Sequence, residues 1–498
     1  MKCFTVGLCL LATLMGHAQT QNNLLNKKEV KEDLYYLDSV LQTTSSYQGL
    51  NGYDYRTDFK TFLKQVQNHP IPKNDFGLFL TRTIGKLGDR HANLKGYDLP
   101  ESLYLPFTFA PYQDSVVVVH YNRGQKEFAF WDEAFPYLLA IDRLPLAELL
   151  PKIRPEDASA PKKSYMLRAV RDLRDIETVF HILGRDLTNP LTITLANEDG
   201  AEKEIPIHLV NDDDKAYLWD ERFAQRNFFL NEEMQQDPEV LETFFALEDN
   251  IAYIQIVDML GRDDSPLFFK LLNDFMVKAK DSKALIIDVR NNGGGTRDLI
   301  QELAGYLVHP DSVYIVNAAR QRASGTLTPD MKDRLHGRYL YAREELNKVE
   351  QRAVDRFMAT FEPIYSLDPR KYSDYHYYVL NGKELSKKKY HYNRPVYVLA
   401  NERTFSAASV LVSVLKDLPN IQIVGSTTDG SSGNSERFEL PHSGFRGKIS
   451  TMVSFQKDGT VLDGTGTAPD IEIERNLDQI FFKEDHQLSE LKVKIRRN

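Results

Sequence analysis

The clearest pattern along the chain lies between residues 250 and 425, where short, continuous apolar stretches alternate with longer amphipathic ones. Continuous apolar stretches of this length predict strands buried on both faces. The predicted strands cover residues 251–256, 284–289, 396–400 and 421–425, and the predicted helices cover 265–279, 296–308 and the stretch after residue 405. Buried strands that alternate with helices are typical of a mostly parallel sheet covered on both faces. We therefore predict an α/β fold with a core of βα units.

The pattern changes on both sides of this core. The first part of the chain has helical periodicity, the next part has short β-rich runs between turn residues, and a charged, tyrosine-rich and mostly helical segment interrupts the core. The predicted domains are a helical N-terminal domain (19–98), a β-rich domain (102–212), the core in two parts (245–317 and 393–475), a helical insertion (318–392) and a charged C-terminal tail (476–498).

The first residues, MKCFTVGLCLLATLMGHAQTQ, combine one lysine, an apolar run from Cys3 to Met15 and small residues up to Ala18. This is typical of a secretory signal peptide over residues 1–18, cut after Ala18, with an uncleaved anchor as the alternative. Because Cys3 and Cys9 both lie in this segment, the mature chain would have no thiol for disulfides, thiolate catalysis or metal binding. We expect a secreted or periplasmic protein.

The remaining composition narrows the possible partners. No later stretch approaches 18 consecutive apolar residues, so we expect no membrane span in the mature chain. The net charge of −9 argues against nucleic acid as a partner. No metal-ligating cluster, phosphate loop or dinucleotide fingerprint stands out, so we expect no cofactor and no metal. The oligomeric state stays open.

Two predicted core strands end in turns that could carry chemistry, because ligands gather at the carboxyl ends of parallel strands. RNNGGGT (290–296) could aim backbone N–H groups at a bound oxygen, as an oxyanion hole requires, although a tight turn also explains the glycines. NERTFSAAS places Ser406 at the start of a helix, where an ordinary capping serine is the alternative. Adjacent strands would bring the turns together, with Ser406 as nucleophile and the N–H groups of Gly294 and Ala407 as oxyanion donors.

The residues around the glycine turn are expected to hold it in place. Gly293 and Gly295 give the backbone its freedom, and Asn292 is expected to cap or fix the turn. Asp288 and Arg290 are expected to form a structural ion pair that stabilises it.

These motifs resemble those of the tail-specific, or carboxyl-terminal processing, serine peptidases. DVRNNGGG is similar to the family's D-L-R-x-N-x-G-G stretch, TFSAAS to its T-x-S-A-S-E nucleophile turn, and DGTGTAPDIEI (463–473) to its E-G-x-G-V-x-P-D-I ending. The resemblance covers roughly residues 250–317 and 393–475. It implies a crotonase/ClpP-like core and a peptide or an unfolded protein as substrate.

The resemblance also implies where the base comes from. The lysine-dyad branch keeps a lysine 25 residues after the serine, where this chain has Ser431. The tricorn-like branch takes a histidine from a D-G-H-T-x-L motif, to which GDRHANL (88–94) is similar, and that histidine is His91. The same branch implies Asp463 as the orienting acid, in place of a glutamate, although a D-G turn explains this residue as well. The resemblance thus implies a Ser406–His91–Asp463 triad.

Other candidates remain open beside this triad. His442 is the next candidate histidine, and Lys448 is a lysine that could act as the base instead. Arg90 replaces a glycine of the family and could narrow the site or place a cation beside His91. Ser409 stands where the family's nucleophile turn has a glutamate.

Residues 102–212 resemble the PDZ-like module of these peptidases through AFPYLLAIDRLPLAELLPKI, although the carboxylate-binding loop is not recognisable. PDZ folds bind peptides as an added strand. We expect a serine peptidase that hydrolyses peptide bonds through an acyl-enzyme. The alternative is a catalytically inactive protein that binds peptides or small ligands on the same fold, which Ser431 and Ser409 favour. An esterase that shares the site is a third possibility.

Overall fold

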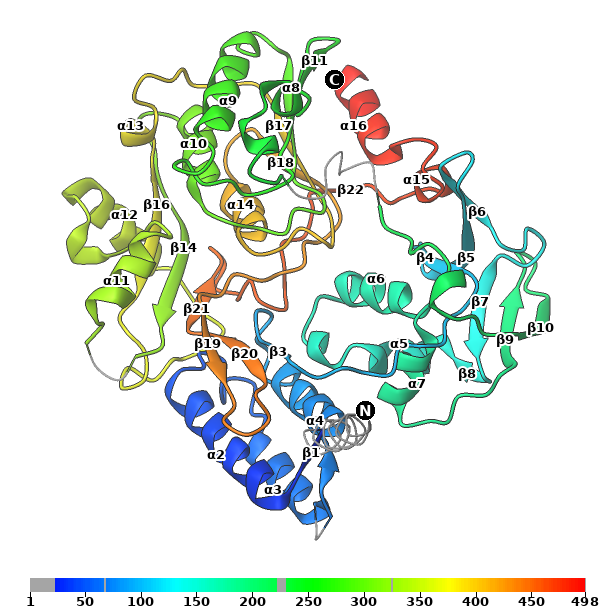
Figure 1. Cartoon of the computed structure of the whole chain (residues 1–498). Coiled ribbons are helices and arrows are strands. Elements are labelled where there is room, and N and C mark those ends of the chain that lie inside the picture. Colours follow the sequence, from blue (N-terminus) through cyan, green and yellow to red (C-terminus); the bar gives the residue numbers. More distant parts are fainter. Residues whose placement is uncertain (1–22, 67–68, 222–229, 324–325, 498) are drawn as a thin grey trace, which may run out of the picture.

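Residues 23–66, 69–221, 230–323 and 326–497 are described by a computed structural model, with the N-terminal helices, a β-rich module and an α/β core arranged around a central region (Figure 1). The predicted signal peptide and its cleavage site after Ala18 lie outside the described residues. Among the described residues, no helix is both long and apolar enough to cross a membrane.

The central sheet has six strands in the order β11-β12-β13-β17-β18-β22. Neighbouring strands from β12 to β22 run parallel, and the edge strand β11 is antiparallel to β12. The strands are β11 (Phe245–Glu248), β12 (Ile251–Gln255), β13 (Ala284–Asp288), β17 (Val396–Ala400), β18 (Ile421–Gly425) and β22 (Ile471–Glu472). Every residue of β13 and β17 is buried, as their continuous apolar sequences require.

Helices cover both faces of this sheet. The side chains of Leu285 and Ile287 pack in one cluster with the helices α9 (Pro266–Lys278), α10 (Asp298–Leu307) and α14 (Ala407–Leu415). Ile286 faces the other way and packs with Leu491 and Ile495 of α16 (His486–Arg497). Most of the predicted charged tail is therefore a helix that packs on the sheet, because apolar residues such as Leu491 and Ile495 recur on one face of it. The shorter α15 (Leu477–Ile480) precedes it.

The segment 318–392 is only partly helical, which corrects the prediction of a helical insertion. It contains α11 (Pro329–His336), α12 (Lys348–Met358) and the short α13 (Gly382–Leu385), but also β15 (Leu340–Ala342) and β16 (His376–Asn381). These strands join β14 (Val313–Gln321) and β21 (Met452–Phe455) in an antiparallel sheet of order β15-β16-β14-β21. The aromatic and β-branched run HYYVL favours a strand at β16.

The β-rich region forms a seven-stranded antiparallel sheet whose main order is β10-β9-β7-β5-β4, with β6 and β8 paired to its strands. Its strands are β4 (Thr108–Tyr112), β5 (Ser115–Asn122), β6 (Glu127–Phe130), β7 (Tyr137–Ile141), β8 (Leu144–Pro145), β9 (Leu191–Ala196) and β10 (Glu202–Ile207). The helices α5 (Leu146–Ile153), α6 (Lys162–Asp172) and α7 (Ile176–Leu183) contribute to its hydrophobic core. In Figure 1 this module lies beside the N-terminal helices and the core.

The N-terminal helices are α2 (Lys27–Thr43), α3 (Tyr55–Gln65) and α4 (Lys73–Gly85). They share a hydrophobic core with a three-stranded sheet of order β19-β20-β3 (Figure 1). Its strands are β3 (Asn93–Lys95), β19 (Ser435–Glu439) and β20 (Arg446–Ser450). Because β3 pairs with β20, residues near position 90 lie beside residues near position 450.

Candidate active site

Ser406 lies in a strained turn between β17 and α14. It is the N-cap of α14, and its backbone has φ 54° and ψ −126°, a region that non-glycine residues rarely adopt. Its N–H donates to Ser431 Oγ at 3.0 Å, and the N–H of Phe405 donates to the carbonyl of Asn292 at 2.9 Å. Such strain persists only where surrounding contacts hold it, and it is common at functional sites.

The glycine turn after β13 lies directly against Ser406, because β13 and β17 are neighbours in the sheet. A Cβ atom on Gly294 would lie 2.5 Å from Ser406 Cβ and 3.0 Å from Ala407 N, and Gly294 has φ +100°. Only glycine fits this approach. The turn is held by Asn292, whose Nδ2 donates to the carbonyl of Ile256 at 2.7 Å.

Asn292 also accepts the N–H of Gly294, which the sequence predicted as an oxyanion donor. The Gly294 N–H donates to Asn292 Oδ1 at 2.8 Å, so it is not available to an oxyanion in this structure. The prediction of Gly294 as a donor is corrected to a packing role. Met259 donates its N–H to the carbonyl of Gly294 and accepts the N–H of Thr296, the two residues that flank Gly295. In this parallel pairing, the N–H of Gly295 therefore points away from Met259.

A cavity of about 220 Å³ opens beside the serine. Its lining brings together the end of the glycine turn, the nucleophile turn and the loop after β18. The residues are Gly295, Thr296, Arg297, Gly337, Arg338, Ser406, Ala407, Val410, Ser432 and Gly433. Within the described ranges, no group of three or more His, Cys, Asp or Glu side chains could hold a metal ion.

His91 reaches the serine from the N-terminal part of the chain. Its Nε2 lies 3.1 Å from Ser406 Oγ, within hydrogen-bonding distance. Asp89 fixes the backbone at this point by accepting the N–H groups of His91 at 2.9 Å and Ala92 at 3.1 Å. The same carboxylate accepts both the N–H and the hydroxyl of Ser450 at 2.6 Å, which ties this segment to the end of β20.

Asp463 lies on the far side of the imidazole. Its Oδ1 is 4.0 Å from His91 Nδ1 and, among the described residues, has no hydrogen-bond partner, although it is buried. Its Oδ2 accepts the Ser432 hydroxyl at 2.6 Å. His91 Nδ1 instead lies 3.2 Å from the Gly433 N–H, which donates to it. The three predicted residues are thus brought together, with one hydrogen bond of the triad replaced by a backbone contact.

The Asp463 carboxylate also affects its buried neighbours. Burial, and then the negative charge of Asp463, raise the pKa of Asp89 above its usual value. The same two causes raise the pKa of the buried Tyr47 phenol. This region therefore concentrates negative charge that a protonated imidazole would neutralise.

Arg90 is not a free cation beside His91. Its guanidinium donates to Asp157 at 2.5 Å and to both oxygens of Asp429 at 2.9 and 3.0 Å. Arg168 of α6 also pairs with Asp429, at 2.5 Å. These pairs join the β-rich module to the loop that carries Ser431, which the motif around position 90 did not reveal.

The other candidate bases do not line the cavity beside Ser406. His442 pairs with Glu32 at 2.6 Å. Lys448 lies on β20, and burial is the largest cause that lowers its pKa. Ser409 donates to the carbonyl of Thr404 at 2.6 Å, which supports the turn in place of a glutamate.

Asp288 and Arg290 form the predicted ion pair, with 2.7 Å between Arg290 Nη2 and Asp288 Oδ2. Arg290 also pairs with Asp485 at 2.7 Å, just before α16. Sequence reasoning missed Ser432 and Gly433, although the clustered small residues of GSTTDGSSG were a signal.

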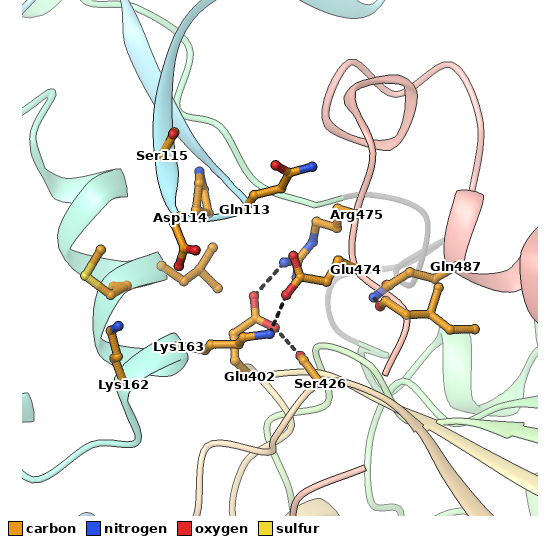
Figure 2. Close-up of a pocket in the computed structure, with 14 residues that line it drawn as sticks. Gln113, Asp114, Ser115, Lys162, Lys163, Glu402, Ser426, Glu474, Arg475 and Gln487 are labelled. Carbon is orange, nitrogen blue, oxygen red and sulfur yellow. Dashed lines mark hydrogen bonds and ion pairs between the residues drawn. The ribbon is translucent and has the colours of Figure 1, made fainter. Parts of the chain in front are cut away.

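A second cavity of about 220 Å³ lies between the β4–β5 hairpin, α6 and the segment after β22 (Figure 2). Its charged groups are largely paired within the protein. Arg475 pairs with Glu402 at 2.7 Å, and Lys163 pairs with Glu474 at 2.7 Å. Glu402 also accepts the Ser426 hydroxyl at 2.6 Å. It shares no lining residue with the cavity beside Ser406.

Comparison with known proteins adds the family. Residues 250–473 match the model of peptidase family S41. The match covers somewhat less than half of the chain. The match indicates a serine-type peptidase, and the strands and turns that carry Ser406 lie inside the matched region.

Solved structures share the fold over most of this chain. Mature CPAF in complex with lactacystin is 19% identical, with a TM-score of 0.61, over 95% of this chain and 99% of that one. Another structure of mature CPAF is 17% identical, with a TM-score of 0.61, over 94% of this chain and 96% of that one. A curated protein of Chlamydia pneumoniae is 25% identical over 232 residues, which are 42% of this chain and only 36% of the relative.

Proposed function

We propose that the whole protein hydrolyses peptide bonds of peptides or unfolded protein segments through an acyl-enzyme. The observation that carries this proposal is the 3.1 Å between His91 Nε2 and Ser406 Oγ, beside a cavity inside the region that matches peptidase family S41. In the first step, His91 takes the hydroxyl proton while Ser406 Oγ attacks the carbonyl carbon. His91 then gives this proton to the leaving amine, and water releases the acyl group by the same route.

The oxyanion of this reaction would be bound by backbone donors. Ala407 N–H lies at the start of α14, and both Ala407 and Gly295 line the cavity with Ser406. We assign the two donors to Ala407 and Gly295 rather than to Gly294, whose N–H already has a partner. Asp463 would accept the Nδ1 proton of His91 and hold the imidazole in the tautomer that acts as a base.

This role requires a small rearrangement. A neutral imidazole that accepts the Gly433 N–H at Nδ1 carries its proton on Nε2, so it cannot take the serine proton. The base forms when the Gly433 peptide moves off Nδ1 and the gap of 4.0 Å to Asp463 closes. Catalytic hydrogen bonds are often long before substrate binds.

The same contact favours a second candidate function. If Gly433 stays on His91 Nδ1, the protein binds peptides without cleaving them. This is the inactive alternative, and it rests on the 3.2 Å between Gly433 N and His91 Nδ1.

The setting of this activity is part of the proposal. The opening sequence supports secretion or a periplasmic location after removal of residues 1–18. The motif GDRHANL supports a relation to the histidine-using, tricorn-like branch. The β-rich module would serve as a PDZ-like peptide-binding domain.

Labelling by a fluorophosphonate separates the two functions, because only an activated serine reacts. We expect the parent to be labelled and to cleave an unfolded protein substrate, and Ser406→Ala to do neither at an unchanged melting temperature. His91→Ala should lose at least about 10³-fold in kcat, whereas Lys448→Met stays within a few-fold of the parent. A folded parent that is not labelled would establish the inactive function. If Lys448→Met lost its activity and His91→Ala kept it, the base would be Lys448 in a serine–lysine dyad and not His91.

A further inference from the structure

Two arginines line the cavity beside Ser406, and they come from different parts of the chain. Arg297 is the N-cap residue of α10, immediately after the glycine turn, and its exposed fraction is 4%. Arg338 follows α11 in the segment 318–392. Both share this cavity with Ser406 and Ala407. The core and the inserted segment therefore each contribute one arginine to the lining of the cavity beside Ser406.

Neither arginine has a carboxylate partner among the described residues, and the contacts of both are with neutral groups. Arg297 Nη1 donates to the carbonyl of Arg338 at 3.1 Å, and its guanidinium lies 5.7 Å from the ring centre of Tyr378. Arg338 Nη1 donates to the carbonyl of Arg334 at 3.1 Å. A buried charge without a counterion is strongly unfavourable.

The acidic neighbour of Arg297 is used elsewhere. Asp298 accepts the Tyr339 hydroxyl at 2.6 Å and the N–H of Arg262 at 2.9 Å. Burial, together with the positive charge of Arg338, lowers the pKa of Arg297 to about 10. The guanidinium thus remains charged at neutral pH, and the described residues leave it without a carboxylate partner.

The second cavity shows the opposite arrangement. In Figure 2, Arg475 and Lys163 face carboxylates of the protein itself, Glu402 and Glu474. Each of these cations also pairs with another carboxylate, Arg475 with Glu221 at 2.9 Å and Lys163 with Glu472 at 2.5 Å. The two cations of that cavity are thus neutralised in place, whereas the two arginines of the cavity beside Ser406 have no such carboxylate partner among the described residues.

We propose that Arg297 and Arg338 bind a carboxylate of the substrate next to the bond that is cleaved. This inference rests on the proposed peptidase function and names its substrate class. A guanidinium offers paired N–H donors that match a carboxylate. The cavity of about 220 Å³ is many times the roughly 10–15 Å³ that a single water molecule needs, so it has room for one acidic side chain. The segment 318–392 thereby gains a role, because it delivers Arg338 to the site.

The carboxylate could belong to an aspartate or glutamate side chain or to the carboxyl terminus of a peptide, and matched substrates distinguish these sources. Internally quenched peptides would carry Glu or Gln at either position flanking the cleaved bond, and a second pair would end in a free acid or an amide. Loss of a buried charge partner lowers kcat/KM by at least about 30-fold. We expect this preference in one of the two pairs, and equal rates in both would overturn the proposal.

Variants of the arginines test which residues carry the preference. Arg297→Met and Arg338→Met should reduce the ratio of kcat/KM for acid over neutral peptide toward one, and Arg297→Lys should keep part of it. Arg334→Gln neutralises an exposed cation on α11 and should keep the parental ratio. Melting temperatures and fluorophosphonate labelling identify folded variants. A full acid preference in folded Arg297→Met and Arg338→Met variants would refute the assignment.

Binding separates this proposal from the catalytic one. In Ser406→Ala, calorimetry with the same acid and neutral peptides requires no turnover. Tighter binding of the acid peptide, lost in Ser406→Ala combined with Arg297→Met, supports the carboxylate site even if the parent shows no hydrolysis. Equal binding of acid and neutral peptides overturns the site even if the parent is an active peptidase.

Discussion

Asp463→Asn is the sharpest test of the proposed base, because the structure predicts which way the new amide would face. Ser432 donates its hydroxyl to Asp463 Oδ2 at 2.6 Å, so an asparagine would keep its carbonyl oxygen there. Its NH₂ group would then face His91 Nδ1, which lies 4.0 Å from Oδ1 in the parent. That NH₂ group would donate to Nδ1, as the Gly433 N–H already does. The imidazole would be held with its proton on Nε2 and could not act as a base.

The expected loss follows from the tautomer. An amide in place of the orienting carboxylate of a triad lowers kcat by about 10⁴-fold. KM should stay within about three-fold, because Asp463 does not line the cavity beside Ser406. The melting temperature should not fall, because a buried carboxylate oxygen without a partner is replaced by a neutral group.

Steady-state kinetics with a quenched peptide, the rate of fluorophosphonate labelling and thermal unfolding by circular dichroism measure these three quantities. Asp311→Asn is the matched control, since the Asp311 side chain is 93% exposed and the change in charge is the same. A variant with kcat within about ten-fold of the parent would refute the orienting role. A lower melting temperature with unchanged kcat would make Asp463 a structural residue only.

Three further changes test the surroundings of the site. Gly294→Ala places a Cβ 2.5 Å from Ser406 Cβ and should lower kcat by about 10²-fold, because it displaces the serine. Gly293→Ala is the control and should retain most activity, because no atom lies within 4 Å of its Cβ. Equal effects in the two variants would contradict this reasoning. Ser431→Ala removes the acceptor of the Ser406 N–H and should destabilise the fold by about 1–3 kcal/mol and lower kcat, and full activity would show that Ser431 does not hold the turn. Leu491→Ala should lower the free energy of unfolding, measured in urea, by about 2–5 kcal/mol, because Leu491 is buried in the core. Lys494→Ala should change this free energy little, because Lys494 is half-exposed. An unchanged free energy of unfolding in Leu491→Ala would show that α16 is not part of the core.

The core strands could be predicted from the sequence because their signal is local. β13 and β17 are almost wholly apolar and β12 and β18 largely so, and a strand buried on both faces requires that composition. The meeting of the glycine turn with Ser406 followed from the adjacency of β13 and β17. These features depend on neighbours along the chain and on the rules of parallel sheets.

Other features depend on contacts that no local pattern encodes. The strand β16 lies in a tyrosine-rich stretch whose charged flanks suggested helices, and its place in a sheet depends on pairing with β14 and β15. The partner of the Gly294 N–H is a side chain two residues away, and its orientation decides whether the donor is free. Arg297 and Arg338 are 41 residues apart, and nothing in the sequence indicates that they share a cavity.

The position of His91 shows how the candidate site depends on the whole fold. GDRHANL pointed to this histidine through a family motif, whereas the physical reason for its place is the Asp89 carboxylate. That carboxylate accepts four hydrogen bonds, two from the backbone after it and two from Ser450. Ser450 ends β20, which pairs with β3 just after His91, so the N-terminal helices and the last strands of the core fix the imidazole together. Since burial and the charge of Asp463 both raise the pKa of Asp89, the carboxylate that fixes the backbone at His91 interacts electrostatically with the proposed orienting acid. The geometry of the proposed base is therefore set by two remote segments at once, and a change in either should alter the rate through the distance between His91 and Ser406.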